Sequence, residues 1–326
     1  MTDQIARADG RRISDPPRVL RTGWLKPSLA AELDRRYGAL PLPEDDSWPD
    51  FARRHGEQVE AVVCSGRTGV TAEQMRALPR LRAVINHGVG FDRVDAGFAR
   101  RTGIQVANTP DVLTDCVADT AVGLVIDVMR GLSAADRFVR AGRWPVERNF
   151  PLTRRVTGCR VGILGLGRIG LAVARRLDGF GVAVRYHSRA RRDDVAYAYA
   201  PTPVDLARDS DVLVVTAAGG PQTQRLVGRT VLEALGPRGF LVNVARGSVV
   251  DEDVMVAMLA SGGLGGAGLD VFSQEPEVPP RLLDLDNVVL LPHLASGTEE
   301  TREAIAQLVL RNLDSYFSTG AVLTPV

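Results

Sequence analysis

Short runs of β-branched residues alternate with helical patterns along most of the chain, and this alternation constrains the fold more than any other feature. The first strand-like runs are Val19-Leu20, 59–64, 81–85 and 104–107. Helical patterns separate them near 28–37, 71–78 and 94–101. Strands and helices in strict alternation form parallel sheets that helices cover on both faces. The pattern predicts a small flavodoxin-like unit in this part of the chain.

A second alternation follows a long helical segment over 111–130, whose apolar residues recur with the helical period. Its strand-like runs are 161–164, 182–186, 212–215, 240–244 and 267–269. Helical patterns between them lie near 168–177, 231–235 and 253–259. Right-handed crossovers through such helices give a doubly wound sheet of the dinucleotide-binding kind.

The chain is predicted to cross between two α/β domains twice. A last helix, predicted over 299–317, follows the second alternation, and we expect it to pack back on the first unit. One domain then comprises 1–106 and 294–326, and the other, 107–293, is inserted into it. Ligands usually bind where such domains meet.

Composition excludes several classes of partner and site. The 326 residues carry 40 Lys and Arg against 39 Asp and Glu, so neither nucleic acid nor an anionic membrane is the expected main partner. Three widely spaced cysteines without a CxxC pattern indicate reduced thiols in the cytoplasm, with no metal site. Residues 1–16 lack an apolar export segment, and we expect an unstructured polar lead there.

A glycine-rich fingerprint follows the strand 161–164 and opens the next helix. It reads Gly165-Leu166-Gly167-Arg168-Ile169-Gly170. In a dinucleotide site, Gly165 permits the tight turn, Gly167 lets the pyrophosphate approach the helix terminus, and Gly170 packs helix on strand. This context makes 107–293 the expected NAD(P)-binding domain, and the alternative is helix–strand packing without a ligand.

The residues after the next strand favour NADP over NAD. An NAD site has an acidic residue about 20 positions after the glycines. Here Ser188, Arg189, Arg191 and Arg192 come before any carboxylate. Guanidinium groups hold phosphate oxygens bidentately, so this segment suits a 2′-phosphate. The alternative is a solvated basic turn.

Three residues at predicted strand ends are candidates for acid–base chemistry on a 2-oxo acid. His293 follows the second domain crossing and is the strongest proton donor among four histidines. Arg246 suits a substrate carboxylate, and Glu275 would favour the protonated form of a neighbouring imidazole. The alternatives are a structural histidine and an ordinary strand-end salt bridge.

Eight sequence blocks, in order after about residue 17, resemble the D-isomer-specific 2-hydroxyacid dehydrogenase family. They are Gly88–Asp92, Asn108–Asp115, Val117–Asp119, Gly165–Gly170, Val244–Gly247, Gly268–Phe272, Glu275-Pro276 and Pro292-His293. Within the family the chain is most similar to the glyoxylate/hydroxypyruvate and hydroxyphenylpyruvate reductases. Several independent blocks in the right order are more specific than any single motif.

The resemblance implies roles for individual residues. It makes Arg246 the substrate-orienting cation, His293 the acid/base and Glu275 its partner. The implied substrate contacts are Val89, Gly90, Ser296 and Trp144. The implied cofactor contacts are the loop 165–170, Ser188, Arg189, Arg192, Thr216, Val244, Ala245 and Asp270. Trp144 resembles a tryptophan that reaches the neighbouring subunit's pocket, which implies a homodimer.

These observations together predict an NADPH-preferring D-2-hydroxyacid dehydrogenase. It would reduce small 2-oxo acids such as glyoxylate and hydroxypyruvate to D-2-hydroxy acids, with NAD(H) as the alternative cofactor. One rival interpretation is a reductase of bulkier 2-oxo acids, of the hydroxyphenylpyruvate or 2-ketogluconate type. The other is a nucleotide-sensing binding protein, because the fold also resembles that of dinucleotide-responsive corepressors.

Overall fold

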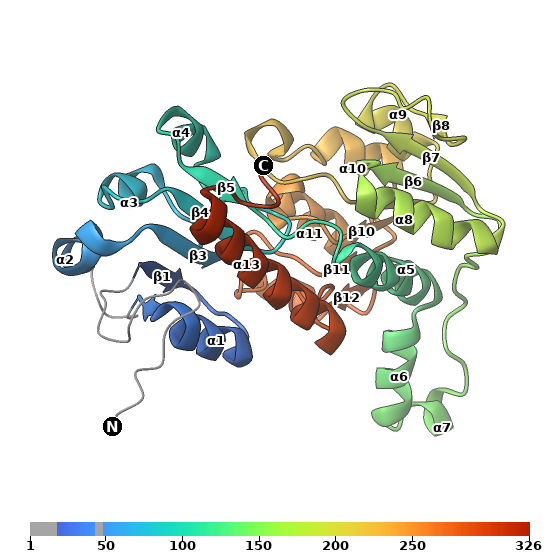
Figure 1. Cartoon of the computed structure of the whole chain (residues 1–326). Coiled ribbons are helices and arrows are strands. Elements are labelled where there is room, and N and C mark those ends of the chain that lie inside the picture. Colours follow the sequence, from blue (N-terminus) through green and yellow to red (C-terminus); the bar gives the residue numbers. More distant parts are fainter. Residues whose placement is uncertain (1–17, 43–47) are drawn as a thin grey trace. The chain divides into compact units, whose positions relative to one another are not determined.

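The computed structural model describes residues 18–42 and 48–326, which form two units (Figure 1). Unit 1 comprises the chain up to Leu113 and Thr298–Val326, and unit 2 is the inserted segment Thr114–Gly297. The predicted polar lead over 1–16 lies outside the described residues. Among the described residues, no helix is both long enough and apolar enough to cross a membrane.

The unit boundaries fall a few residues later in the chain than the predicted ones at 106/107 and 293/294. The first boundary moves because the residues after residue 106 are hydrogen-bonded within unit 1. Asn108 Nδ2 donates to the carbonyl of Val89 at 2.8 Å, and Thr109 N donates to the carbonyl of Gly88 at 3.1 Å. A hydrophobic pattern does not reveal such bonds, and the unit boundary of the structure therefore differs from the predicted one.

Unit 1 is built on a five-stranded parallel sheet in the order β2-β1-β3-β4-β5. Its strands are β1 (Val19–Thr22), β2 (Leu40–Pro41), β3 (Ala61–Ser65), β4 (Ala83–His87) and β5 (Gln105–Ala107). Its helices are α1 (Pro27–Tyr37), α2 (Trp48–His55), α3 (Ala72–Arg76), α4 (Ala96–Arg101) and α13 (Glu299–Thr319), with the 3₁₀ turn η1 (Gly56–Gln58). This strand order is that of a flavodoxin-like sheet.

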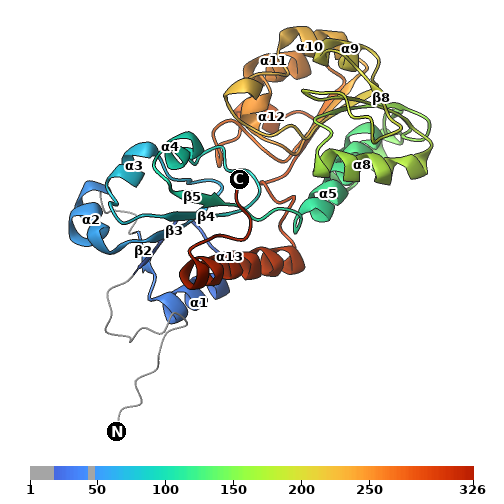
Figure 2. The same ribbon diagram turned by 45° about the horizontal axis from the view of Figure 1, so that its top comes forward.

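Alternating strand residues divide the core of unit 1 into two layers. On one face, α1 and α13 bury Leu33 and Val309 against residues such as Val63. On the other, α2, α3 and α4 cover residues such as Val62, with Met75 fully buried. Figure 2 shows α13 lying along the sheet of this unit, although it is the last helix in the chain. From the sequence we expect the last helix to pack back on the first unit, and the position of α13 against this sheet agrees with that expectation.

Unit 2 contains a seven-stranded parallel sheet in the order β12-β11-β10-β9-β6-β7-β8. The strands are β6 (Arg160–Leu164), β7 (Ala183–His187), β8 (Ala198–Tyr199), β9 (Val212–Val215), β10 (Phe240–Asn243), β11 (Gly266–Leu269) and β12 (Val288–Leu290). The helices are α5 (Thr114–Arg130), α6 (Leu132–Arg140), α7 (Trp144–Glu147), α8 (Arg168–Leu177), α9 (Pro203–Arg208), α10 (Arg229–Leu235), α11 (Glu252–Ser261) and α12 (Pro280–Leu283). The 3₁₀ turns are η2 (Asp178–Phe180), η3 (Pro221–Thr223) and η4 (Gly247–Val249).

The strand order of unit 2 reverses direction at β6, which is the Rossmann arrangement of a doubly wound sheet. In the parallel pairing, Asn243 of β10 lies opposite Val215 of β9 and Leu269 of β11. The carboxyl ends of these strands therefore meet at one edge. The predicted fold class, a Rossmann domain inserted in a flavodoxin-like domain, is confirmed.

Candidate active site

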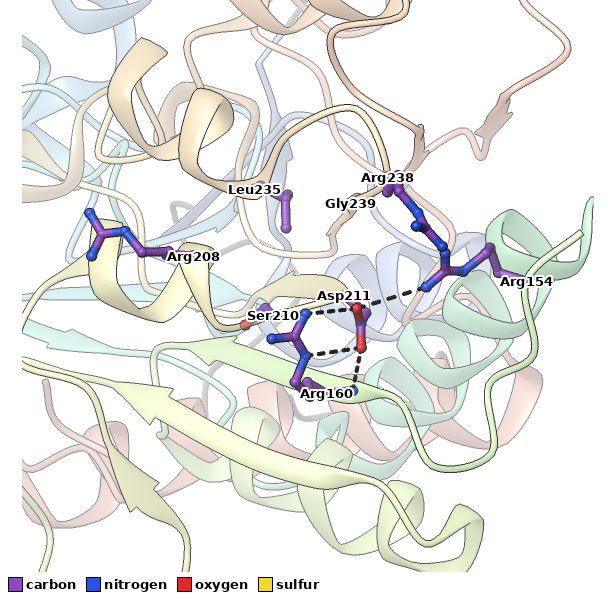
Figure 3. Close-up of a pocket in the computed structure, with 8 residues that line it drawn as sticks. All are labelled: Arg154, Arg160, Arg208, Ser210, Asp211, Leu235, Arg238 and Gly239. Atoms are coloured by element: carbon purple, nitrogen blue, oxygen red, sulfur yellow. Dashed lines mark hydrogen bonds and ion pairs between the residues drawn. The ribbon is translucent and has the colours of Figure 1, made fainter.

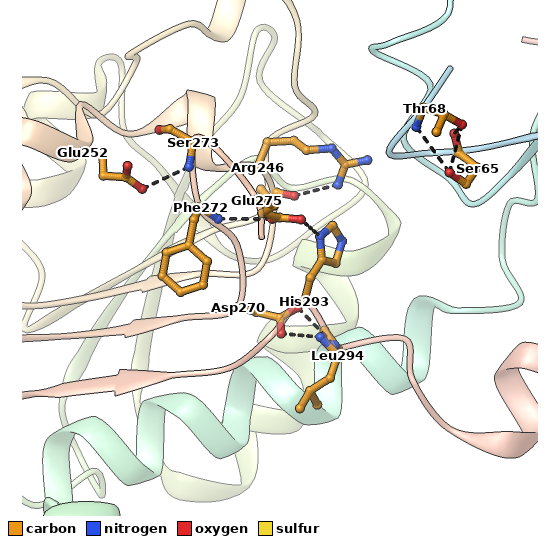
Figure 4. Close-up of polar contacts among 12 residues, drawn as sticks. Ser65, Thr68, Arg246, Glu252, Asp270, Phe272, Ser273, Glu275, His293 and Leu294 are labelled. Atoms are coloured by element: carbon orange, nitrogen blue, oxygen red, sulfur yellow. Dashed lines mark hydrogen bonds and ion pairs between the residues drawn. The ribbon is translucent and has the colours of Figure 1, made fainter. Parts of the chain in front are cut away.

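The three residues predicted to carry out catalysis follow three adjacent strands. Arg246 follows β10, Glu275 lies in the loop after β11, and His293 follows β12. Because β10, β11 and β12 are neighbouring parallel strands, these loops lie at the same edge of the sheet. Residues that are far apart in the sequence are thus brought together within unit 2 (Figure 4).

His293 and Glu275 form a direct pair. The distance from His293 Nδ1 to Glu275 Oε2 is 2.6 Å, and the side chains are 26% and 15% exposed. The other carboxylate oxygen of Glu275 accepts a hydrogen bond from the backbone N–H of Phe272 at 3.2 Å. With both oxygens engaged, the carboxylate orients the ring. The Nε2 atom is then the ring nitrogen left for a proton transfer.

Asp270 fixes the backbone that carries His293. Its two carboxylate oxygens accept from the N–H groups of Leu294, at 2.7 Å, and Ala295, at 3.0 Å. His293 has φ +55°, a left-handed conformation that non-glycine residues adopt only where their surroundings hold them. Burial raises the pKa of Asp270, and the two N–H groups partly offset this effect. Asp270, which the family resemblance places at the nicotinamide, therefore also positions the histidine loop.

Arg246 is held against the loop of Glu275 by the glycine that follows it. A Cβ at Gly247 would lie 2.0 Å from the carbonyl carbon of Phe272, so only glycine permits this contact. Arg246 Nη1 also donates to the carbonyl of Ala245 at 2.8 Å. The family resemblance contains Gly247 only within the block Val244–Gly247. The sequence alone did not indicate that Gly247 packs against the backbone of Phe272. A glycine directly after a candidate arginine at a strand end is the signal that points to it.

The glycine-rich loop has the geometry of a dinucleotide cradle. Gly165 has φ +101°, and a Cβ there would lie 2.6 Å from Ala217 N. A Cβ at Gly170 would lie 2.2 Å from the carbonyl oxygen of Gly165, so this glycine packs the helix on the strand. A Cβ at Gly167 would meet no described protein atom within 4 Å, and Gly167 is the N-cap of α8. The N-terminus of that ten-residue helix is thus open to a pyrophosphate.

The remaining residues of the predicted cofactor set lie at the same sheet edge. Thr216 follows β9, and its hydroxyl donates to the carbonyl of Gly165 at 2.7 Å. Val244 and Ala245 follow β10, and Ala245 N donates to Asn243 Oδ1 at 3.0 Å. The glycine loop and the ends of these strands have the arrangement that a nicotinamide dinucleotide requires.

The arginines after β7 differ in how they are engaged. Arg192 donates to both carboxylate oxygens of Asp194 and, through Nη1, to the carbonyl of Leu166 at 2.8 Å. Arg191 lies 3.8 Å from Asp193. Within the described part of the chain, the Arg189 guanidinium has no acidic or carbonyl partner. Ser188 Oγ donates to the carbonyl of Ala190 at 2.7 Å. Arg189 is therefore a cation of this turn that is open to a phosphate.

In unit 1, the turn at 88–90 is fixed by the side chain of Asn86, which was not among the residues predicted from the sequence. Asn86 Nδ2 donates to the carbonyls of Gly88, at 3.0 Å, and Gly90, at 3.1 Å. Val89 and Gly90 donate their backbone N–H groups to no other described residue. The carbonyls are thus held and the amides are left for an anion. The signal for Asn86 is a polar residue inside an otherwise apolar strand.

The two remaining predicted substrate contacts have contrasting environments. Ser296 lies three residues after His293 in the same loop and is half-buried. Trp144 is the first residue of α7 and is 57% exposed. The short helix α7 follows α6, which extends away from α5 (Figure 1). Across the residues that the structure describes, neither Ser296 nor Trp144 forms a hydrogen bond with the Glu275–His293 pair.

Comparison with known proteins identifies relatives along nearly the whole chain. The family model for the D-isomer specific 2-hydroxyacid dehydrogenase, NAD binding domain, matches residues 122–295. Hydroxyphenylpyruvate reductase of Plectranthus scutellarioides is 47% identical over 298 residues, which cover 91% of this chain and 95% of the relative. Glyoxylate/hydroxypyruvate reductase A of Arabidopsis thaliana is 46% identical, with the same coverage of 91% and 95%.

A solved structure extends the likeness to the fold. The NADPH-dependent glyoxylate/hydroxypyruvate reductase of Sinorhizobium meliloti, in complex with NADP and malonate, matches with a TM-score of 0.89 and 44% identity. The match covers 96% of this chain and 97% of that structure. Together with the inserted Rossmann unit and the Glu275–His293 pair, these matches decide the assignment. The chain belongs to the D-isomer-specific 2-hydroxyacid dehydrogenase family and is an oxidoreductase that uses a nicotinamide cofactor.

Proposed function

We propose that this chain is an NADPH-preferring D-2-hydroxyacid dehydrogenase that reduces small 2-oxo acids such as glyoxylate and hydroxypyruvate. The observation that carries the proposal is the 2.6 Å pair between His293 Nδ1 and Glu275 Oε2, on the same sheet edge as Arg246. The names of the plant and bacterial relatives, and the malonate bound to one of them, support a small carboxylate substrate.

In the proposed reaction, protonated His293 gives its Nε2 proton to the carbonyl oxygen of the substrate. The reduced nicotinamide, when bound, supplies the hydride that C2 accepts, so the carbonyl becomes a secondary alcohol or, from glyoxylate, a primary one. Glu275 holds the ring through Nδ1 before transfer.

Arg246 and the turn at Val89-Gly90 are proposed to hold the substrate. A guanidinium binds the carboxylate and carbonyl oxygens of a 2-oxo acid bidentately, and two backbone N–H groups are donors for its carboxylate. Fixing the carboxylate and the carbonyl oxygen of the substrate leaves only one face of C2 open to hydride, which gives a single stereoisomer where C2 becomes chiral. Ser296 is proposed to lie beside the substrate.

The proposed cofactor preference rests on Arg189 and Ser188, with Arg192 in a supporting position. Arg189 follows β7 at the edge of the sheet that carries the glycine loop, and no carboxylate precedes Asp193 there. A guanidinium with no acidic or carbonyl partner among the described residues suits a 2′-phosphate dianion. The Sinorhizobium relative is itself NADPH-dependent, which supports this preference.

The test is NADPH oxidation measured with a panel of 2-oxo acids, using the parent enzyme and His293→Asn. The variant should lose about 10²–10⁴-fold in kcat with glyoxylate and hydroxypyruvate, because its side chain donates no labile cationic proton. His55→Asn, in α2 of unit 1, is the matched control and should retain parent activity. Parent-like turnover in His293→Asn contradicts the mechanism.

The same panel separates the two rival functions. Hydroxyphenylpyruvate as the preferred substrate would favour the bulkier class, as the name of the Plectranthus relative suggests. If no 2-oxo acid is reduced while NADPH still binds, the chain acts as a nucleotide-sensing protein. Each result excludes small 2-oxo acids as the physiological substrates.

The proposal includes a homodimer in a reducing compartment such as the cytoplasm. Segment 132–152 exposes several large apolar side chains, which monomeric surfaces rarely gather in one segment. They are Leu132, Val139, Trp144, Val146 and Leu152. All three cysteines are free, and burial raises the pKa of Cys64 to about 12. Sedimentation equilibrium tests the dimer, and a monomer at micromolar concentration contradicts it.

A further inference from the structure

A cavity of about 300 Å³ opens at the amino ends of three strands of unit 2 (Figure 3). Arg160 begins β6, Asp211 directly precedes β9, and Gly239 directly precedes β10. A second cavity of about 410 Å³ adjoins it and shares Arg154, Asp211 and Arg238 with it. The two cavities together are called the arginine pocket. Its five arginines are Arg154, Arg155, Arg160, Arg208 and Arg238.

The arginine pocket is distinct from the proposed cofactor edge. Gly165, Thr216 and Val244 follow the carboxyl ends of β6, β9 and β10, whereas the pocket lies at the opposite ends of the same strands. The five residues of β6 separate the two edges by roughly 15 Å, given the rise of a parallel strand. No residue of the predicted active site lines the pocket.

One carboxylate, that of Asp211, contacts two of the five arginines. Arg160 donates to Asp211 at 3.0 and 3.3 Å, and its backbone N–H donates to the same carboxylate at 2.9 Å. Arg154 reaches Asp211 from another side at 3.9 Å (Figure 3). Both oxygens of Asp211 are thereby engaged, so this carboxylate has little capacity left for further guanidinium groups.

Two arginines of the pocket are left without a counter-charge. The side chains of Arg155 and Arg238 have no hydrogen-bond or ion-pair partner among residues 18–42 and 48–326. Arg208 is paired outside the pocket with Asp205 at 2.8 Å. The chain as a whole is nearly neutral, at +1, so this excess of guanidinium groups is a local feature. Like charges around a cavity repel, and a bound anion relieves that repulsion.

We propose that the arginine pocket binds a small phosphate-bearing anion. Guanidinium groups bind phosphate oxygens bidentately, and a dianion or trianion can satisfy Arg154, Arg155 and Arg238 at once. The two cavities, of about 300 and 410 Å³, each lie within the range for small-molecule sites, so the pocket admits a pyrophosphate or a phosphorylated metabolite rather than an extended polymer. The ligand binds at the edge of the sheet opposite to the cofactor.

The test uses isothermal titration calorimetry with inorganic pyrophosphate as the probe. The enzyme is first saturated with NADPH, so that the glycine loop and Arg189 are already occupied and do not contribute. Sodium chloride at matched ionic strength is the reference, because screening alone weakens nonspecific binding. The parent enzyme is expected to bind pyrophosphate with one site per chain. Absence of saturable binding overturns the proposal.

Variants assign the binding to this pocket. The double variant Arg154→Ala/Arg238→Ala should bind pyrophosphate at least tenfold more weakly, and Arg238→Ala alone should weaken it measurably. Both positions are solvent-accessible, and thermal unfolding confirms that each variant is folded. Arg229→Ala, an exposed arginine paired with Glu233 on α10, is the matched control and should bind like the parent.

Two further outcomes contradict the proposal. Parent-like affinity in the double variant places the pyrophosphate elsewhere on the protein. The second outcome combines two results: the parent does not bind pyrophosphate, and the double variant changes the subunit stoichiometry in sedimentation. In that case the arginines bind carboxylates of a second copy of the chain. A saturable site that is lost in the double variant, with unchanged stoichiometry, supports the phosphate site.

Discussion

The Glu275 carboxylate holds the His293 ring through its Nδ1 atom. Replacing it with a glutamine amide keeps the size and one acceptor and removes the charge. Glu275→Gln should lower kcat about 10- to 100-fold. Steady-state kinetics with NADPH and glyoxylate measures this loss.

A second carboxylate beside the site provides the control for that prediction. Glu252 Oε2 accepts from the N–H of Ser273 at 3.0 Å, and this bond does not involve His293. Glu252→Gln should leave kcat at the value of the parent enzyme. If Glu275→Gln keeps the same kcat as Glu252→Gln and the parent, the role proposed for Glu275 is contradicted.

Arg189 and Arg192 lie in the same turn but differ in their predicted effect on cofactor choice. Arg189→Ala should weaken NADPH binding by about 1–3 kcal/mol and leave NADH binding nearly unchanged, because only the 2′-phosphate loses a charged donor. Arg192 also holds the carbonyl of Leu166 in the glycine loop, so Arg192→Ala should weaken both cofactors. Fluorescence titration with each cofactor measures these losses, and equal losses in Arg189→Ala refute the assignment.

At the scale of elements, helix α13 and the chain end depend on one buried amide. Asn312 is fully buried, and its Oδ1 accepts from the N–H groups of Leu323 at 2.9 Å and Thr324 at 3.1 Å. Its Nδ2 donates to Leu308 O at 2.9 Å and Thr324 Oγ1 at 3.0 Å. The chain end in turn bonds to β5, because Val326 N donates to Val106 O at 3.0 Å.

Asn312→Ala should therefore destabilise the packing of the chain end on unit 1 by about 2 kcal/mol, since it leaves the part-buried N–H groups of Leu323 and Thr324 without acceptors. Gln307→Ala, on the exposed side of the same helix, removes only a surface hydrogen bond to Glu303 and should cost less than about 0.5 kcal/mol. Urea unfolding of the two variants and the parent measures the difference. Similar costs for both would show that the amide network is not what holds the chain end.

For the whole molecule, His87 makes stability depend on pH. It is 5% exposed, and burial together with the charge of Arg302 lowers its pKa to about 4. An unfolded histidine titrates near 6.5, so between about pH 6.5 and 4 the unfolded chain binds a proton that the folded chain does not. Stability therefore falls as the pH falls through this window.

This effect amounts to about 2 kcal/mol between pH 7 and 5. His87→Phe keeps a buried ring of similar shape without a titrating group, and it should lose less stability over that interval than the parent. Urea unfolding at both pH values checks this. Identical pH dependence of the two proteins contradicts the role of His87.

The local patterns made much of this architecture predictable. The helix α8 begins at Arg168 and ends at Leu177, as the sequence indicates, because its apolar face and the glycine before it are local signals. The long helix α5 begins at Thr114, slightly later than predicted. By contrast, α2 (Trp48–His55) was not predicted, because its polar sequence carries one buried residue, Phe51, and its stability comes from packing on the sheet.

Sequence by itself determined the alternation of strands and helices and the glycine loop, and it predicted Arg246, Glu275 and His293 as the catalytic candidates, since propensity, periodicity and motif spacing are properties of neighbours along the chain. Tertiary structure alone decided that Asp270 fixes the histidine loop, that Gly247 packs against the backbone of Phe272, and that five arginines line two adjoining cavities with Asp211. These contacts join residues from the ends of separate strands. The proximity of those ends depends on the order and register of the strands in the sheet, which a short-range sequence pattern does not indicate.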